Sequence, residues 1–138
     1  MQAQPLRAYL ERVRAKIEEL EPLISSVSLH MDQRGPTRLV LKGTIIFING
    51  TKLHFLEYIS VEDNSLERIV YRFHYVKPDN KVIFRYDNAP HHLELETFPH
   101  HKHLANGAVV ASEEQTLPRV LDEIKALVLR SFRGRDNV

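Results

Sequence analysis

Two apolar runs joined by a short turn constrain the fold of this chain more than any other feature. The runs occupy residues 39–48 and 53–61, and Asn49-Gly50 lies between them. Apolar runs on either side of an Asn-Gly dipeptide are typical of a β-hairpin. A loop at residues 49–51 pairs Phe47 with Leu53, and this register gathers an apolar set on one face.

The same register puts the acidic Glu57 on the mostly apolar face, opposite Gly43. One interpretation is a carboxylate at the end of the sheet that reaches solvent. The other is a partly buried acid with a cationic partner, and the sequence does not decide between them. The remaining predicted pairs of this hairpin are Ile45–Phe55 and Leu41–Ile59.

A second hairpin is predicted from residues 69–76 and 82–87, with Asp79-Asn80 as its loop. One of its faces is aromatic and the other is charged. The charged face is either a solvated side of the sheet or a binding surface, because its strand leads directly into a histidine-rich segment. The predicted pairs are Pro78–Lys81 beside the loop, Tyr75–Phe84 and Phe73–Tyr86 on the aromatic face, and His74–Arg85 and Arg72–Asp87 on the charged face.

An amphipathic helix is predicted at each end of the chain. In residues 5–20 and 116–132, apolar side chains recur at spacings of three and four, and Thr116 is a good N-cap for the second helix. Residues 23–31 and 108–111 suggest further strands. We therefore expect one α+β domain over residues 1–138, in which an antiparallel β-meander sheet packs against an N-terminal and a C-terminal helix.

Composition excludes several classes of function. The formal net charge of +1 argues against a molecule that binds nucleic acid through its overall charge. The chain has no cysteine, so thiolate zinc sites and thiol nucleophiles are excluded, and a reducing compartment fits. No apolar run approaches the ~20 residues that cross a bilayer, and the first residues do not resemble a signal peptide. We expect a cytoplasmic protein with no membrane association.

Five of the 8 histidines fall between His91 and His103. Each of the two doublets adjoins a proline, so we expect both on turns or loops. Imidazole exchanges protons near neutrality and also binds metals, which makes this segment the candidate site. The alternative is a polar loop whose imidazoles only hydrogen-bond to nearby backbone. The candidate catalytic residues are His91, His92, His100, His101, His103 and Asp87.

We expect these six side chains to converge on one cleft, because residues 93–98 are long enough to return the second doublet to the edge where the first one lies. Arg85 and Lys102 are expected to flank the cleft. The residues assigned to substrate binding are Arg85, Lys102, Arg72 and His74, and those assigned a supporting role are Glu57 and Asn88.

Two mechanisms use several imidazoles. In the first, a neutral histidine accepts a proton while a protonated one donates a proton, as RNA cleavage by its own 2′-hydroxyl requires, and no cofactor is needed. In the second, histidines and a carboxylate bind zinc or another divalent transition metal that activates water. The segment lacks a helical His-Glu-x-x-His arrangement, so we favour acid–base chemistry over a metal.

Three strings within this region resemble the TumE family, the toxin components of prokaryotic type II toxin–antitoxin systems. They are Tyr71-Arg72-Phe73-His74-Tyr75, then Phe84-Arg85-Tyr86-Asp87-Asn88-Ala89-Pro90-His91-His92, then Thr97-Phe98-Pro99-His100-His101-Lys102-His103. The resemblance extends over residues 43–121. It implies a protein that inhibits growth and is neutralised by a cognate antitoxin, usually a small helix-turn-helix protein. It supplies neither a target nor a mechanism.

We therefore expect a toxin that acts on RNA through acid–base histidines. The alternatives are a metal-dependent hydrolase or nuclease on the same loops, and a non-enzymatic inhibitory binding module. The antitoxin is expected to cover the histidine loops or the basic end at Arg130, Arg133 and Arg135, and a homodimer stays open.

Overall fold

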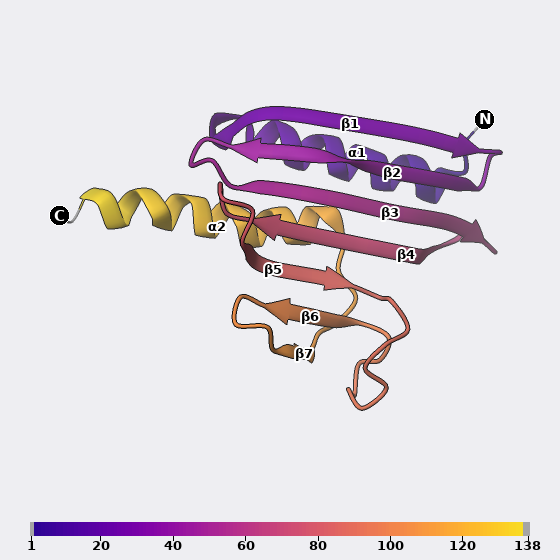
Figure 1. The fold of residues 1–138 in the computed structure, drawn as a ribbon. Helices are drawn as coiled ribbons and strands as arrows, with labels where there is room; N and C mark the ends of the chain where they lie inside the picture. The colour runs from indigo at the N-terminus through magenta and orange to yellow at the C-terminus, as the bar shows by residue number, and fades with distance from the viewer. Residues whose placement is uncertain (1, 137–138) are drawn as a thin grey trace.

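A seven-stranded antiparallel sheet with one helix before it and one after it makes up the fold (Figure 1). The structure is a computed structural model that describes residues 2–136, with side chains to residue 133. Strand order in the sheet follows chain order, which confirms the predicted α+β meander. The elements are α1 (Gln4–Glu19), a 3₁₀ turn (Glu21–Leu23), β1 (Ile24–Arg34), β2 (Arg38–Phe47), β3 (Lys52–Glu62), β4 (Ser65–Val76), β5 (Val82–Asp87), β6 (His101–Leu104), β7 (Val109–Ala111) and α2 (Leu117–Asp136).

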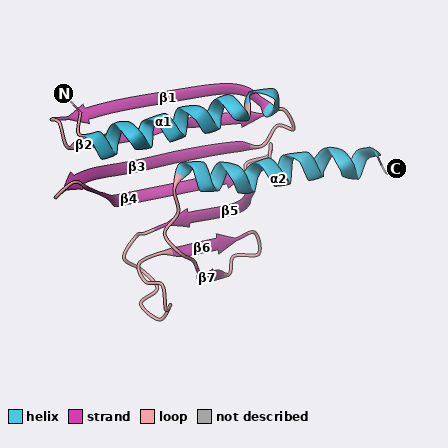
Figure 2. Ribbon diagram, turned by 180° about the vertical axis from the view of Figure 1, so that it is seen from behind, coloured by secondary structure: helices cyan, strands magenta, loops and turns pink. Residues whose placement is uncertain are grey.

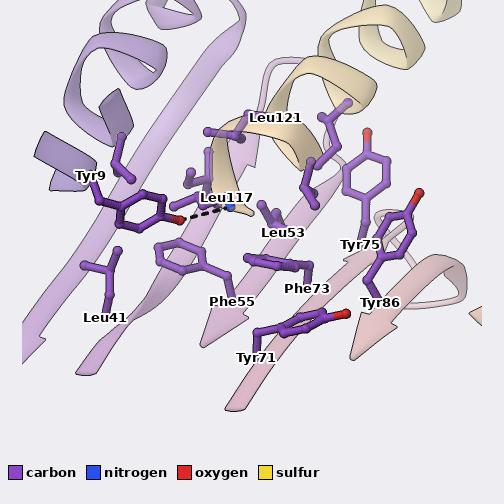
Figure 3. Packing of buried hydrophobic residues seen from close by; sticks show 14 of the residues in the cluster. Tyr9, Leu41, Leu53, Phe55, Tyr71, Phe73, Tyr75, Tyr86, Leu117 and Leu121 are labelled. Carbon is purple, nitrogen blue, oxygen red and sulfur yellow. Dashed lines mark hydrogen bonds between the residues drawn. The ribbon is translucent and has the colours of Figure 1, made fainter. Parts of the chain in front are cut away.

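Both helices cover the same face of the sheet (Figure 2). The core lies between this face and the helices, where α1 contributes Leu6 and Val13, and α2 contributes Leu121 and Val128. Aromatic side chains from the central strands fill much of it, among them Tyr71 (Figure 3). Because side chains alternate along a strand, every second residue of β2 to β5 enters this core and the intervening ones face away from the helices. Thr116 Oγ1 accepts a hydrogen bond from Arg119 N at 3.3 Å, as expected of an N-cap.

The predicted register of the first hairpin was wrong by two residues. Leu53 pairs with Ile45 rather than Phe47, and Glu57 pairs with Leu41 rather than Gly43. Gly50 has a φ of 85°, the left-handed backbone conformation that glycine adopts without strain. A three-residue hairpin loop places such a residue last, so the loop is residues 48–50 and Phe47 N bonds to Thr51 O at 2.9 Å. A shift of two residues keeps every side chain on its predicted face.

The second hairpin has the four predicted side-chain pairs, from Arg72–Asp87 to Tyr75–Phe84. Its turn differs from the prediction, because Lys77 N bonds to Lys81 O at 2.9 Å and encloses a three-residue loop that ends at Asn80, with φ 69°. Pro78 is therefore in the loop and does not face Lys81. A register shift after Tyr75 absorbs the difference and restores the predicted pairing.

The two ends of the sheet depart most from the sequence prediction. Residues His101–Leu104 form strand β6 rather than a loop, since they complete the ladder beside β5. At the other end, β1 extends to Arg34 and has a neighbour on one side only. Its apolar residues Val27 and Met31 remain 42% and 57% exposed, because α1 does not cover this edge fully. Within residues 2–136, no helix is long and apolar enough to span a bilayer.

Candidate histidine site

The face of the sheet away from the helices, here called the open face, carries two rows of mostly polar side chains. Residues that pair directly in antiparallel strands project to the same side, so each row follows from the register. Both rows run from β2 to β6 and end in histidines. The first row is Thr44, His54, His74, Arg85 and His103, and the second is Lys42, Leu56, Arg72, Asp87 and His101.

Three imidazole rings gather at the β5–β6 end of these rows, and two of them contact one carboxylate. This histidine cluster consists of His92, His101, His103 and Asp87. The His101 Nε2 atom lies 2.9 Å from Asp87 Oδ1, and His103 Nε2 lies 3.4 Å from Asp87 Oδ2. The three ring centroids are 5.0, 5.1 and 6.0 Å apart. The strands β5 and β6 and the loop between them therefore bring one histidine of each doublet, His92 and His101, into one site with His103.

Donors surround the Asp87 carboxylate, which is only 3% exposed. Arg85 Nε donates to Oδ2 at 3.0 Å, and Ala89 N donates to Oδ1 at 3.0 Å. His101 is 1% exposed, and its Nδ1 donates to the carbonyl oxygen of Pro99 at 2.9 Å. A carbonyl oxygen can only accept, so this bond fixes the orientation of the ring and directs Nε2 at Asp87. Asp87 and His101 thus form a buried pair that supports the other two rings.

His92 and His103 are the members of the cluster that solvent reaches, with side chains 33% and 32% exposed. Burial lowers the pKa of His103, and the nearby charges of His101, Arg85 and His92 lower it further, although Asp87 acts in the opposite direction. His92 has a φ of 63°, a left-handed conformation that is uncommon outside glycine and that concentrates at functional sites. Its Nδ1 atom lies 3.4 Å from Glu94 Oε1.

Three predicted members of the site lie elsewhere. Lys102 projects to the helix-covered face, where its Nζ donates to Glu123 Oε2 at 3.0 Å. His100 stacks on Tyr71, with ring centroids 5.7 Å apart. The His91 side chain is exposed and has no hydrogen bond or ion pair with residues 2–136. The structure therefore brings together His92, His101, His103, Asp87 and Arg85, whereas the predicted convergence was wrong for Lys102, His100 and His91.

The alternation of side chains in β6 explains why Lys102 is separated from its neighbours. His101 and His103 are two residues apart and share the open face, so the residue between them must point to the other face. On that face, Lys102 Nζ also lies 4.7 Å from the centre of the Tyr86 ring. Lys102 therefore links β6 to α2 and does not flank the cluster.

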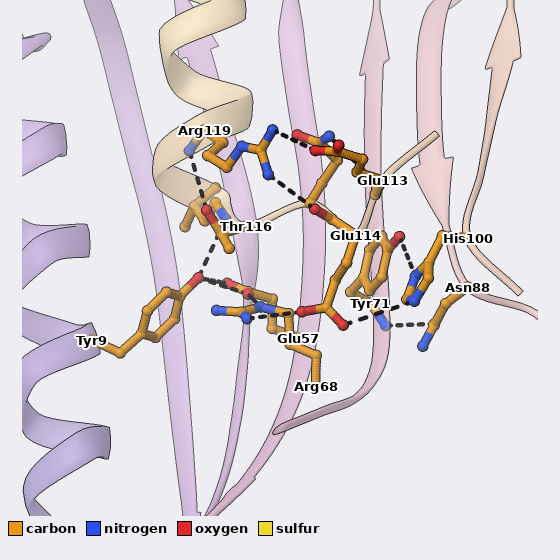
Figure 4. Close-up of polar contacts among 12 residues, drawn as sticks. Tyr9, Glu57, Arg68, Tyr71, Asn88, His100, Glu113, Glu114, Thr116 and Arg119 are labelled. Carbon is orange, nitrogen blue, oxygen red and sulfur yellow. Dashed lines mark hydrogen bonds and ion pairs between the residues drawn. The ribbon is translucent and has the colours of Figure 1, made fainter. Parts of the chain in front are cut away.

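Glu57 is fully buried beneath the helices (Figure 4). Arg68 Nε donates to Glu57 Oε2 at 2.7 Å, and the Tyr9 hydroxyl lies 2.6 and 2.7 Å from the two carboxylate oxygens. Leu117 N donates to the Tyr9 hydroxyl oxygen at 3.2 Å, which joins both helices to this network. Burial raises the pKa of Glu57, and Arg68 and Tyr9 act against that increase. Of the two interpretations of Glu57, the buried acid with a cationic partner is confirmed.

Asn88 attaches the start of the β5–β6 loop to β4. Its Oδ1 accepts from Tyr71 N at 2.9 Å, and its Nδ2 donates to Ile69 O at 3.1 Å. These bonds hold the chain directly after Asp87, so they fit the supporting role that was predicted for Asn88.

His74 and Arg72 lie on the open face, as the predicted hairpin requires. The His74 ring stacks on His54, with centroids 6.3 Å apart, and its buried Nδ1 atom has no hydrogen-bond partner in the described chain. Burial lowers the pKa of His74, and positive charges on the surrounding residues lower it further. Those residues are Arg85, His54, Arg72 and His103. Basic side chains therefore surround His74 at the centre of the open face.

Several residues in these networks were missed from the sequence. Tyr9 falls one turn before Val13 on α1, so helical spacing alone could have placed it in the core. Lys42 and His54 alternate with buried residues in β2 and β3, and alternation could have assigned them to the open face. The register error also hid the two rows of the open face. It shifted Lys42 and Thr44 by two residues relative to β3, so neither was placed opposite its actual partner.

A comparison with protein families identifies the chain. The family model of toxin TumE matches residues 13–128. The chain belongs to the TumE family. Neither a curated protein nor a solved structure matches it.

The matched region covers both rows of the open face and the whole histidine cluster, whereas Tyr9 precedes it. Membership in the TumE family makes this protein the toxin of a toxin–antitoxin system, and its partner is a cognate antitoxin.

Proposed function

We propose that this TumE-family toxin cleaves RNA by acid–base chemistry at the histidine cluster. One observation supports this proposal most: His92 and His103, each about one-third exposed, lie beside a buried Asp87–His101 pair. Two accessible imidazoles with different surroundings can hold different protonation states near neutrality. Arg85 contacts the same carboxylate and is 38% exposed, so a cation also faces the site.

Each group has a defined role in this reaction. His103, whose pKa is lowered, is neutral and accepts the proton of the ribose 2′-hydroxyl. The 2′-oxygen then attacks phosphorus, the bond from phosphorus to the 5′-oxygen breaks, and protonated His92 donates its proton to that leaving oxygen. The products are a 2′,3′-cyclic phosphate and a 5′-hydroxyl. Arg85 stabilises the negative charge that develops on the phosphate, and Asp87 and His101 position His103.

Cleavage of RNA by the purified toxin tests this assignment. Replacing His103 or His92 with alanine is expected to lower the rate by about 100-fold or more, the usual contribution of a general acid or base. The matched control is His91→Ala, because His91 adjoins His92 and its side chain has no hydrogen bond or ion pair with the described residues. Activity should persist in chelator and have a bell-shaped pH profile. The lowered pKa of His103 places the acid limb below the ordinary histidine value of about 6.5. Full activity of the His103→Ala and His92→Ala variants would contradict the proposal.

A metal-dependent hydrolase is the second candidate, and one observation favours it. Ligand atoms of Asp87, His101 and His103 all lie within 4.8 Å of one another. Imidazole and carboxylate ligands suit zinc, and the bond from His101 Nδ1 to Pro99 O is of the kind that orients a metal-bound histidine. These three residues would hold the ion, which would activate water. Loss of cleavage in chelator, with recovery in zinc or manganese, would favour this candidate over acid–base chemistry.

The antitoxin interaction belongs to the same proposal. An antitoxin that covers the histidine cluster blocks the substrate directly, and the exposed residues Arg130 and Arg133 on α2 offer a second contact. The side chain of Arg135 lies outside the described residues. Protection of the cluster from solvent in the toxin–antitoxin complex, measured by hydrogen exchange, is the expected result. A His103→Ala variant that keeps its fold and its toxicity would instead indicate a non-enzymatic binding module.

A further inference from the structure

A hollow of about 480 Å³ lies on the open face, away from the histidine cluster. It spans β1 to β4, and its polar lining includes four groups that are positively charged or can become so: His30, Lys42, His54 and Arg72. Gly43 forms part of its floor, where an added Cβ would overlap the carbonyl oxygen of Ser28. By alternation the Cβ position of Gly43 faces the core beside Phe55, so glycine here lets β1 and β2 approach each other closely.

The two permanent cations of this hollow form no ion pair within the part of the chain that the structure describes. Neither Lys42 nor Arg72 has an ion pair or hydrogen bond with residues 2–136. By contrast, Lys16 on the helical side pairs with Asp122 at 2.7 Å, and Arg68 pairs with Glu57. Two unpaired cations on one face attract anions, and the effect is larger where the surface is hollowed.

The hollow and the histidine cluster are parts of the same two rows. Lys42, Arg72, Asp87 and His101 occupy matched positions in β2, β4, β5 and β6. Adjacent strands lie ~4.8 Å apart, so the four intervals from β2 to β6 extend over roughly 19 Å. A linear polyanion that enters the cluster can therefore lie along the rows, perpendicular to the strands, and contact the hollow as well.

We propose that the open face is a binding track for single-stranded RNA, in which Lys42 and Arg72 bind backbone phosphates several nucleotides from the scissile bond held at the histidine cluster. This inference rests on the proposed function and names the part of the substrate that the cluster itself does not touch. Proteins that bind single strands combine a positively charged groove with loose sequence preference, and phosphate contacts set the register of the strand. His54 lies between the two ends of the track, and its Nδ1 is 2.9 Å from Oγ1 of Thr44 at the β2 end.

Equilibrium binding of an oligonucleotide that cannot be cleaved tests the track. The probe is a fluorescent single strand with 2′-deoxyribose, which lacks the attacking hydroxyl, used in a short form and in a form long enough to span the rows. Wild-type toxin is expected to bind the longer probe more tightly. Lys42→Gln and Arg72→Gln should each weaken binding of the longer probe and reduce the slope of log K against log salt by about 0.7, the value for one phosphate on a single strand. The double variant should bind the longer probe no more tightly than the short probe.

Matched controls separate this effect from overall charge. Lys77→Gln in the β4–β5 turn and Arg7→Gln on α1 remove the same charge from exposed positions outside the track, and both should retain the wild-type salt slope. Thermal unfolding of every variant checks the fold, and Lys42→Met, which keeps the aliphatic stem, should match Lys42→Gln. If the Lys42 and Arg72 variants bind the longer probe with wild-type affinity and wild-type salt slope, the track is refuted. RNA cleavage by the wild type would still support the proposed function in that case. A wild type that neither binds nor cleaves single strands would overturn the proposed function itself.

Discussion

Removing the cation from the buried Glu57–Arg68 pair should destabilise the fold severely. Arg68→Met keeps an aliphatic stem of similar length but leaves the Glu57 carboxylate, which is 0% exposed, without its guanidinium partner. Loss of one member of a buried pair costs about 3–5 kcal/mol, whereas exposed pairs contribute about 0–1 kcal/mol. The Tyr9 hydroxyl still contacts Glu57 in the variant, so we expect a cost near the lower end, about 3 kcal/mol. The free energy of unfolding of a domain is about 5–15 kcal/mol in total, so a loss of about 3 kcal/mol is a large part of it.

Urea denaturation of the wild type and the variants measures this cost. The control is Arg119→Met, because the Arg119–Glu113 pair is 3.5 Å long and its side chains are 54% and 81% exposed. A Glu57→Gln/Arg68→Met double variant should lose less stability than the sum of the two single variants, since no unpaired charge remains buried. If Arg68→Met costs no more than Arg119→Met, the claim that burial makes this pair important is refuted.

Three further changes test other parts of the structure. Gly43→Ala should lower the free energy of unfolding by about 1–3 kcal/mol in urea denaturation, because the new methyl group overlaps the Ser28 carbonyl oxygen; an unchanged midpoint would exclude that contact. Burial lowers the pKa of His74, so the unfolded chain takes up a proton first as pH falls; stability should therefore decline below about pH 6.5, and His74→Leu should reduce the decline in unfolding curves recorded at pH 7 and pH 5. Arg85→Met should lose RNA cleavage and Lys102→Met should retain it, because they lie on opposite faces of the sheet; equal losses would contradict this assignment.

Local patterns predicted most of the architecture. Helical spacing located α1 and α2, and the alternation in residues 69–76 and 82–87 gave four correct cross-strand pairs. The predicted turn of the first hairpin was displaced by one residue, and that of the second hairpin was one residue too short. In both hairpins a left-handed residue at the end of a three-residue loop decides the register, and its φ cannot be read from the sequence. Gly50 and Asn80 occupy these positions.

The candidate site was only partly predictable for a related reason. Proximity in the sequence suggested that all five histidines act together, yet β6 pairs with β5 and thereby fixes alternate side chains on opposite faces. This pairing brings His101 and His103 to Asp87 and sends Lys102 to α2. The buried contact between Tyr9 and Glu57 joins residues 48 positions apart, and no local pattern reports such a distance.

The alternation of side chains along β2 to β5 also places core residues and open-face residues, which are under different constraints, in the same stretch of chain. Leu53, Phe55, Phe73 and Tyr75 belong to the core under the helices, whereas His54, Arg72 and His74, which neighbour them in the sequence, are not members of the core cluster. Substitutions in the second set can change the molecules that the sheet accepts at little cost to folding. Changes at every second residue of these strands can therefore alter the open face while the intervening residues keep the core unchanged.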